Sequence, residues 1–350
     1  MKVNLDKLAE SLVHKIRHYL IATMGRIAEE ASTEEFYRAF SYAFREEIMI
    51  NWAATAKTFV EKDVRMLYYL SMEYLPGRIF GNNISSLHAQ EFVQRVARKM
   101  NRNLNQVLCY EPDPGLGNGG LGRLASCFLD SLATQQYPAQ GYGLRYQYGT
   151  FAQELWDGVQ VERPDCWLLN ANPWEFRRDQ RAMNVKFCGR TEVVKNSYKE
   201  DVLELHDYEE VRALSYDIPI VGYNAGHDYS VISLRLWSTK ESPKNFGMQR
   251  FNAGQLGPAA ENTTLTDVLY PNDNHDIGKR IRLKQEFLLV SASLQDIIRH
   301  YLATHDDFSL FADKVRIQIN DTHPALAIAE LMRLFTREHD LPWDKALEIT

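Results

Sequence analysis

A run of nine residues, Gly115–Arg123, contains five glycines and reads GLGNGGLGR. Glycine tolerates positive φ and has no Cβ, so a phosphate group could approach the main chain closely there. We expect the run to lie between a short strand at 107–110 and a helix, where backbone N–H groups and the helix dipole could bind an anion. The expected helix has one apolar face, formed by Leu121, Leu124, Phe128 and Leu132. The segment therefore predicts a phosphate cradle.

The same run also satisfies the dinucleotide-binding pattern G-x-G-x-x-G, at positions 115, 117 and 120. That pattern alone is weak, because a Rossmann site also requires an acidic residue about 20 positions later to bind the ribose. The segment 141–146 reads GYGLRY, and the next carboxylate is Glu154. A nicotinamide site is therefore disfavoured, whereas a purely structural turn remains an alternative.

A second polar segment, Asn272–His275, reads NDNH directly before an expected long helix at 279–301. Short polar side chains at this position could cap the helix. They could equally form a loop that hydrogen-bonds sugar hydroxyls. The helix begins with the basic run 279–284, KRIRLK. Because positive charge is unfavourable at a helix N-terminus, this run indicates an acidic neighbour.

A third segment, Asp321–His323, follows an alternating strand at 315–319. Ligands of open α/β sheets bind at the C-terminal ends of strands, so this position favours a function. The first two residues of the segment could cap the following helix, with Pro324 in its first turn. Capping leaves His323 unexplained, and no further residue is spaced to make it a metal ligand.

The elements that would position these segments fall into two parts. Residues 1–100 are expected to be mainly helical, with a capping box at Ser32 and Glu35. Residues 101–350 show an α/β pattern. Helical spacing predicts three buried stripes: Phe36, Phe40, Phe44 and Ile48; Leu283, Phe287, Val290, Leu294, Ile297 and Tyr301; and Ile328, Leu331 and Phe335.

The second part is less regular. Residues 135–215 are rich in aromatic and turn-forming residues, and strand signals return at 218–221 and 231–236. Residues 240–264 resemble a long surface excursion. The segment 342–350 resembles a helix that has just begun, without a Gly, Asn or Pro to end it. We therefore expect the chain to be truncated from a longer protein.

Composition excludes several classes of protein. The chain of 350 residues has 45% hydrophobic and 25% charged residues, which is typical of a soluble globular protein. A net charge of −6 argues against a nucleic-acid partner. Four widely spaced cysteines predict neither a disulfide framework nor a zinc site. No apolar run is long enough for a membrane helix and no secretory signal is apparent, so we expect a cytoplasmic protein.

Five strings of the sequence, taken together, resemble the glycogen, starch and maltodextrin phosphorylases. They are Tyr68–Tyr74, Leu116–Ala125, Gly141–Tyr146, Val268–Asn274 and Gln318–Pro324. The similarity extends over the chain from about residue 30. It implies the α/β architecture called GT-B, in which two Rossmann-like domains face each other across a cleft. Residues 101–350 would then be most of the first domain, incomplete at its end.

The resemblance also implies an activity. The family transfers the terminal glucosyl unit of an α-1,4-glucan, such as glycogen or maltodextrin, to inorganic phosphate and releases α-glucose 1-phosphate with retention. Pyridoxal 5′-phosphate is bound as a Schiff base, and its phosphate group is the proton donor. The lysine that binds it and the basic residues that clamp the substrate phosphate belong to the second domain. We therefore expect this chain alone to be inactive, and the full-length protein to be a homodimer.

Several residues of this chain match the family's site around the phosphate. The resemblance implies that Gly119 and Gly120 offer main-chain N–H groups to the phosphates. Asn118 and Leu121 would line the glucosyl subsite. Glu73 would lie near the phosphate and the cofactor, as a supporting residue.

Other matches lie on the two later segments. The resemblance places Asp273 and Asn274 on a mobile gate loop that touches glucose hydroxyls. Asp321 and His323 would line the approach to the site. No metal is implied.

The animal enzymes of the family bind a nucleotide effector through aromatic, glutamine and paired arginine side chains. This chain has Val60, Ala56, Lys57 and the pair Arg299 and His300 at those positions. We therefore expect weak or no activation by AMP.

Three other functions remain alternatives. A glycoside hydrolase would need two acids, for which Glu154, Asp157 and Asp273 are candidates, but it has no use for a glycine cradle. A nucleotide-sugar glycosyltransferase would share the GT-B architecture. The chain could also be an inactive fragment that binds glucan or oligomerises.

Overall fold

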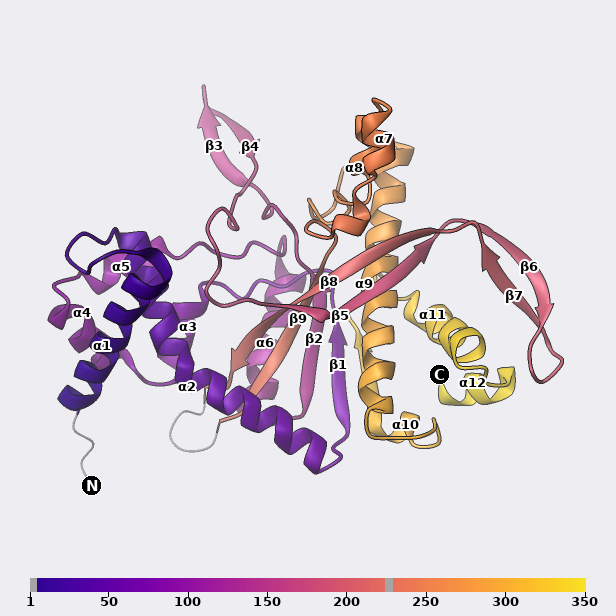
Figure 1. Cartoon of the computed structure of the whole chain (residues 1–350), viewed down its shortest axis with the longest axis horizontal. Helices are drawn as coiled ribbons and strands as arrows, with labels where there is room; N and C mark the ends of the chain where they lie inside the picture. The colour runs from indigo at the N-terminus through magenta and orange to yellow at the C-terminus, as the bar shows by residue number, and fades with distance from the viewer. Residues whose placement is uncertain (1–4, 224–228) are drawn as a thin grey trace.

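A six-stranded sheet forms the centre of the molecule in the computed structural model, which describes residues 5–223 and 229–350 (Figure 1). The strand order is β10-β1-β2-β9-β8-β5. The first four strands are parallel, and β8 and β5 continue the sheet in antiparallel fashion. Their bounds are β10 Val315–Ile319, β1 Met66–Leu70, β2 Ala139–Leu144, β9 Val231–Ser238, β8 Glu209–Val221 and β5 Phe176–Phe187. The structure thus confirms a mixed α/β fold.

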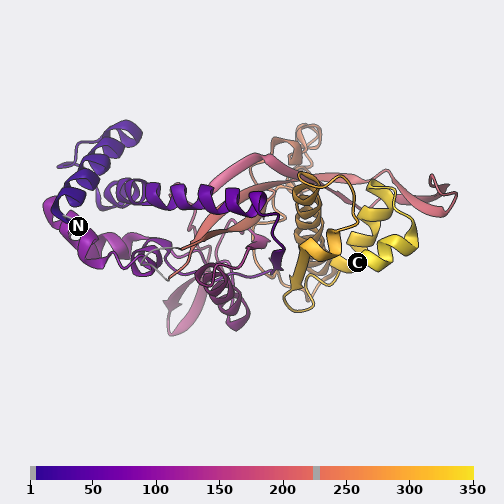
Figure 2. The same cartoon turned by 90° about the horizontal axis from the view of Figure 1, so that it is seen from below.

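Helices cover both faces of this sheet. The long helices α2 (Thr33–Glu61) and α9 (Asp276–Leu302) lie on one face, where Ser233 and Trp237 of β9 bond to them through Trp52 and Ser293. Helix α6 (Gly120–Thr134) packs on the opposite face (Figure 2). The remaining helices are α1 Leu5–Met24, α3 Ile79–Ser86, α4 Gln90–Lys99, α5 Leu104–Tyr110, α7 Met248–Asn252, α8 Leu256–Ala260, α10 Phe311–Lys314, α11 Ala327–Arg333 and α12 Trp343–Ile349, with a 3₁₀ turn at Pro243–Asn245 and a π-helical turn at Leu334–Glu338.

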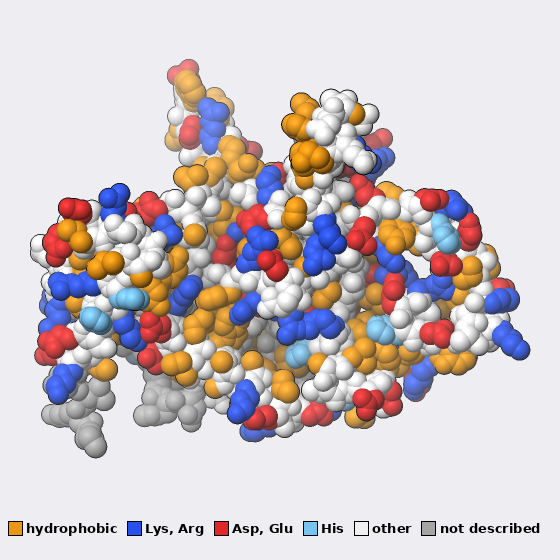
Figure 3. All heavy atoms as spheres, in the orientation of Figure 1, with side chains coloured by type: hydrophobic (Ala, Val, Ile, Leu, Met, Phe, Trp, Pro, Cys, Tyr) orange, Lys and Arg blue, Asp and Glu red, His pale blue; other side chains and the backbone are white. Residues whose placement is uncertain are grey.

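Two hairpins project from the body of the molecule. β3 (Ala152–Trp156) pairs with β4 (Val159–Arg163), and β6 (Arg190–Lys195) pairs with β7 (Asp201–His206). Figure 3 shows apolar side chains on the β3–β4 hairpin and on the neighbouring projection formed by α7 and α8. The segment 135–215, which is rich in aromatic and turn-forming residues, contains β2 to β7 and the start of β8.

The capping box and the apolar stripe predicted near the N-terminus are confirmed. The Glu35 N–H donates to Ser32 Oγ at 3.1 Å and the Ser32 N–H donates to Glu35 Oε2 at 2.8 Å, which completes the capping box of α2. The stripe behind it is buried: Phe36, Phe40, Phe44 and Ile48. In the long helix α9 the predicted seam is buried from Val290 to Tyr301, whereas Leu283 at its start is 57% exposed.

Three predictions about local structure are wrong. Residues 107–110 are not a strand but the end of α5, which Asn103 caps by accepting the N–H groups of residues 105 and 106. The face of α6 that contains Leu124 and Phe128 is exposed, at 49% and 42%. Ile328 on α11 is also exposed, at 62%.

Helix α6 packs on the sheet with the face opposite to the predicted one, because the side chains of that face are smaller. That face, Gly122, Ala125, Ser126, Leu129 and Ala133, is buried. The strand beneath is equally small, since a Cβ on Gly141 would lie 2.7 Å from Leu129 Cδ1. Small side chains on both elements thus let helix and strand approach closely and pack densely.

No helix within the described residues is long and apolar enough to span a membrane. No group of three or more His, Cys, Asp or Glu side chains there is arranged to hold a metal ion.

Candidate functional site

The carboxylate of Glu73 joins two of the predicted segments. Glu73 follows β1 and is 4% exposed. The Asn118 N–H, within the glycine-rich run, donates to its Oε2 at 2.8 Å. The Tyr270 hydroxyl, two residues before the NDNH segment, donates to its Oε1 at 2.6 Å. One buried carboxylate therefore fixes the glycine-rich run against the segment that leads into α9.

The turn that presents Glu73 is itself fixed. Ser71 Oγ donates to the Glu73 carbonyl at 2.8 Å and accepts from the Asn320 side chain at 3.0 Å. Tyr146, from the GYGLRY string, donates its hydroxyl to the Met72 carbonyl at 3.0 Å. The strand end before Asp321 and the end of β2 therefore both support this turn.

The glycines of the run have two different environments. A Cβ on Gly117 would lie 2.8 Å from Leu75 Cγ, and one on Gly122 would lie 3.0 Å from Glu73 Cβ. These two positions need glycine because the run wraps closely around Glu73 and Leu75. A Cβ on Gly119 or Gly120 would meet nothing within 4 Å. The second pair faces open space, as a ligand-facing backbone would.

The run ends at the N-terminus of α6, as predicted, although a helix and not a strand precedes it. Gly119 is the N-cap of α6 and supplies no side-chain hydrogen bond. The first N–H groups of a helix lack intrahelical acceptors and attract negative charge. A helix of 15 residues thus presents its N-terminus at the open side of Gly119 and Gly120.

In the NDNH segment the residue that caps α9 is His275, and not the shorter polar side chains before it. The Gly278 N–H donates to His275 Nδ1 at 3.0 Å. Gly278 also lets the segment fold back, since a Cβ there would lie 1.7 Å from the Asn272 carbonyl oxygen. Asp273 pairs with Arg282 at 2.6 Å, and Asn274 donates its N–H to the Asn272 side chain at 2.9 Å.

The acidic neighbours expected for the basic run 279–284 are present. Besides the pair between Arg282 and Asp273, Lys284 contacts Glu209 and Glu261, each at 3.2 Å. The Arg282 guanidinium also lies 5.2 Å from the centre of the Tyr270 ring, a cation–π contact.

Asp321 and His323 lie at the end of β10, beside this group. Asp321 has a φ of 64°, and its Oδ1 accepts the Thr322 N–H at 2.7 Å. Helix α11 starts only at Ala327 without a side-chain cap, so the predicted capping by Asp321 or Thr322 is wrong. The His323 ring lies 5.6 Å from the Tyr270 ring, and its buried Nδ1 has no hydrogen-bond partner among the described residues.

The three segments that the sequence singled out therefore converge on Tyr270, which sequence reasoning missed. Its ring contacts His323 and Arg282, and its hydroxyl binds Glu73. Burial, followed by the hydrogen bond to Glu73, raises the pKa of Tyr270 above its ordinary value, so the hydroxyl remains a donor. Burial also raises the pKa of Glu286, which the charge of His323 partly offsets.

Within the described residues, the side chains of two predicted residues form no hydrogen bond to this group. Leu121 is half-buried at the start of α6, and the side chain of Asn274 is exposed. The hydrolase candidates Glu154 and Asp157 lie on the projecting β3–β4 hairpin, where Glu154 pairs with Arg163 at 3.3 Å. That pair gives the hydrolase alternative no support.

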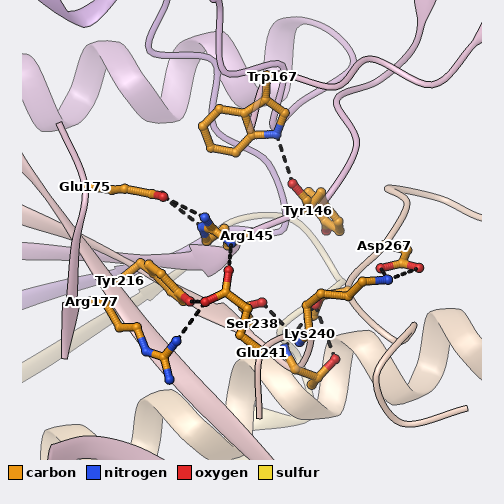
Figure 4. Close-up of polar contacts among 12 residues, drawn as sticks. Arg145, Tyr146, Trp167, Glu175, Arg177, Tyr216, Ser238, Lys240, Glu241 and Asp267 are labelled. Carbon is orange, nitrogen blue, oxygen red and sulfur yellow. Dashed lines mark hydrogen bonds and ion pairs between the residues drawn. The ribbon is translucent and has the colours of Figure 1, made fainter. Parts of the chain in front are cut away.

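A separate polar cluster surrounds Arg145. Figure 4 shows Glu175 and Glu241 near its guanidinium, with Arg145 Nε donating to Glu175 at 2.8 Å. The Tyr216 hydroxyl donates to Glu241 at 2.7 Å, and Arg177 Nη1 donates to the same carboxylate at 2.8 Å. The acids of this cluster are paired with bases, so it has the form of a structural network.

Comparison with known proteins places these observations in a family. A family model described as carbohydrate phosphorylase matches residues 97–350. The chain is 43% identical over 353 residues to a glycogen phosphorylase of Chlamydia pneumoniae, covering all of this chain and 42% of that protein. It is 42% identical to a glycogen phosphorylase of Haemophilus influenzae, covering 41% of it. It is 40% identical over 360 residues to the human liver form, again covering 41%. The chain thus spans about two fifths of the length of these relatives.

Proposed function

The chain belongs to the carbohydrate phosphorylase family, and we propose that it forms the first part of a glycogen phosphorylase. The reaction would transfer the terminal α-1,4-linked glucosyl unit of glycogen or maltodextrin to inorganic phosphate, giving α-glucose 1-phosphate with retention. The observation that carries the proposal is the Glu73 carboxylate, which binds both the Asn118 N–H and the Tyr270 hydroxyl. It brings an anion-binding loop and a polar gate segment to one place.

Within this site the glycine-rich run would bind phosphate. The open space beside Gly119 and Gly120 and the N-terminus of α6 support this role. Backbone N–H groups that are fixed before the reaction stabilise developing negative charge without reorganisation. Asn118 and Leu121, on either side of the two glycines, would contact the glucosyl unit.

The gate segment would act on the sugar. Asp273 would bind glucose hydroxyls as a hydrogen-bond acceptor once released from Arg282, with which it now pairs at 2.6 Å. Asn274 has an exposed side chain that supports a similar contact. His323, whose buried Nδ1 lacks a partner among the described residues, would donate to or accept from a ligand, with Asp321 at the approach.

The family implies pyridoxal 5′-phosphate as cofactor, and the residues present fit part of it. The open space beside Gly119 and Gly120, at the N-terminus of α6, suits its phosphate group. When bound, the cofactor supplies a phosphate that donates a proton to the substrate phosphate. Lys284, the buried lysine of the described chain, is held by Glu209 and Glu261 and does not suit a Schiff base. We propose that the attachment lysine belongs to the part of the relatives' length that this chain does not match.

The same part of the relatives would complete the architecture. We propose that residues 1–100, which are mainly helical but include strand β1, and the α/β residues 101–350 together form most of the first domain of a GT-B protein. A second Rossmann-like domain would close the cleft and supply the basic residues that clamp phosphate. The complete protein would be a cytoplasmic homodimer, and this chain alone would be inactive.

The proposal can be tested with a joined polypeptide, in which this chain is followed by the unmatched C-terminal part of the Chlamydia pneumoniae relative. With maltodextrin and phosphate it should release α-glucose 1-phosphate, and without phosphate it should release nothing. Free glucose in the absence of phosphate would instead indicate a hydrolase. Activity that required UDP-glucose or ADP-glucose would indicate a nucleotide-sugar glycosyltransferase. The chain alone should be inactive in every assay.

A further inference from the structure

The glycine-rich run and the gate segment are joined through one hydroxyl group. Glu73 has two acceptor oxygens, and each is used by a different segment: Oε2 by the Asn118 N–H and Oε1 by Tyr270 Oη. Because Glu73 is 4% exposed, water reaches it little and cannot readily replace either donor. A hydrogen bond to a buried charge is among the stronger contacts in a protein.

On the gate side, Tyr270 is tied to Asp273. Arg282 binds Asp273 Oδ2 at 2.6 Å and also lies over the Tyr270 ring at 5.2 Å. Tyr270 itself has a φ of 50°, a left-handed conformation that is costly for a bulky aromatic residue and persists only where its surroundings fix it. A movement of the gate segment that releases Asp273 therefore also disturbs the surroundings of Tyr270.

On the cradle side, the Glu73 carboxylate positions the run directly. It accepts the N–H of Asn118, the residue before Gly119, and Gly117 and Gly122 close around it. The Leu75 N–H donates to the Gly122 carbonyl at 2.9 Å, which fixes the other end of the run. Rotation of the carboxylate would thus shift the peptide groups that lead into Gly119 and Gly120.

We propose that Tyr270 is a positioning residue that couples the two segments: through Glu73 it holds the N–H groups of the glycine-rich run in their ligand-binding orientation while the gate is closed. Tyr270 contacts neither phosphate nor sugar in this role. The inference rests on the proposed function for the purpose of the run, but the coupling itself is a property of the 350-residue chain. It can therefore be tested without catalysis.

The first test is hydrogen–deuterium exchange on the 350-residue chain with Tyr270→Phe, which removes only the hydroxyl. Exchange of the amides of residues 117–123 should become roughly tenfold faster, because one of two donors to a buried carboxylate is lost. Tyr216→Phe is the matched control, since Tyr216 also donates to a glutamate, Glu241, in the separate Arg145 cluster. It should leave exchange at 117–123 unchanged. Faster exchange at 268–278 alone, with 117–123 unaffected, would overturn the coupling.

A double-mutant cycle distinguishes the Tyr270–Glu73 interaction from independent effects of each substitution on the structure. Glu73→Leu keeps the approximate size of the side chain and removes both acceptor oxygens. If the coupling runs through the Tyr270–Glu73 contact, the double variant should exchange no faster at 117–123 than Glu73→Leu alone. Simple addition of the two effects would contradict the proposal. Where a variant of the cycle does not fold, the KM for phosphate of Tyr270→Phe in the joined polypeptide decides between the two outcomes.

The second test uses the joined polypeptide. Tyr270→Phe should raise KM for inorganic phosphate roughly tenfold with a smaller change in kcat, because the phosphate-binding N–H groups are misplaced. An unchanged KM for phosphate would overturn the positioning role. If the joined polypeptide shows no phosphorolysis at all, the proposed function fails while the exchange result still decides the coupling.

Discussion

Arg235 and Asp217 form a two-point ion pair across strands β9 and β8, in which Arg235 Nε and Nη2 donate to the two carboxylate oxygens at 2.7 and 2.8 Å. Nη1 of the same guanidinium donates to Asp296 of α9 at 2.5 Å, and Tyr142 donates to that carboxylate at 2.7 Å. The two carboxylates raise the pKa of Arg235 in spite of its burial. This network fastens α9 to the sheet.

Arg235→Met should therefore destabilise the chain strongly. Without the guanidinium, Asp217 and Asp296 lose the cation they share. Removing one partner of a buried ion pair lowers the free energy of unfolding by about 3–5 kcal/mol. Urea unfolding at pH 7 measures the difference. The control is Arg177→Met, whose partners Asp179 and Glu241 are largely exposed and whose loss should cost about 1 kcal/mol or less. A similar small cost for Arg235→Met would contradict the assigned role.

The pH dependence of stability should contain a contribution from Glu111. Both of its oxygens accept the Phe80 N–H at the start of α3, and burial raises its pKa to about 7. The folded state thus binds the proton more tightly than the unfolded state, so stability is present below about pH 4.5 and is lost as the pH rises to about 7. Relative to Glu111→Gln, wild-type stability should fall by about 2 kcal/mol between pH 5 and pH 8.

Chemical denaturation of both proteins across this pH range measures that contribution. Glu111→Gln keeps an acceptor for the Phe80 N–H and cannot ionise, so it reports the rest of the protein. A stability difference that does not change with pH would contradict the titration of Glu111. A difference that grows in favour of the wild type at high pH would show that its sign is wrong.

The glycines of the run should separate into structural and ligand-facing positions. Gly117→Ala places a Cβ 2.8 Å from Leu75 Cγ and should destabilise the chain by about 1–3 kcal/mol. Gly120→Ala, at the first position of α6 and in open space, should leave stability unchanged or raise it by about 0.5 kcal/mol. Thermal and urea unfolding of the two variants measure this. Equal destabilisation would mean that all of these glycines serve packing.

AMP should activate the joined polypeptide weakly or not at all. Val60 and His300 line a cavity of about 160 Å³, but His300 Nδ1 shares a hydrogen bond with the Tyr68 hydroxyl at 2.9 Å. Arg299 binds Asp296, and the exposed Lys57 pairs with Glu61 at 3.5 Å. The polar groups at these positions, Lys57, Arg299 and His300, are thus engaged by protein partners, which disfavours a nucleotide site built from them. A large, saturable rise in phosphorolysis on titration with AMP would contradict this.

The sequence predicted regular and strongly patterned elements well. The stripe of α2, the strand at 315–319 and most of the α9 seam are present, because each has a clear periodic pattern of apolar residues or a clear N-terminal cap. The short apolar run at 107–110 was misassigned, since four apolar residues fit a strand and a helix equally, and Asn103 supplied a cap. The buried face of α6 was misassigned because the prediction followed the spacing of the large apolar residues, whereas the face that packs on the sheet is formed mainly by small residues.

The site was predicted in its segments but not in its connections. Glycine content and strand-end position identified the run and His323, because both signals are local. Tyr270 has no such signal: it lies in one of the five family-like strings, but its residue type and position predict no role, and its importance comes from a contact with Glu73, 197 positions away. The choice of His275 as the cap of α9 likewise depends on how Asn272 folds back onto Gly278. Long-range contacts of this kind cannot be derived from spacing.

The most direct measurement is the rate of α-glucose 1-phosphate release by the joined polypeptide with Gly120→Val, at a series of phosphate concentrations. The valine side chain fills the open space beside the N-terminus of α6 without meeting protein atoms near its Cβ. Gly81→Val, at another open glycine in α3, is the matched control. Loss of phosphate-dependent release by Gly120→Val, with an unchanged melting temperature and an active control, is the expected result. Undiminished release with the same KM for phosphate would contradict a phosphate site on the glycine-rich run.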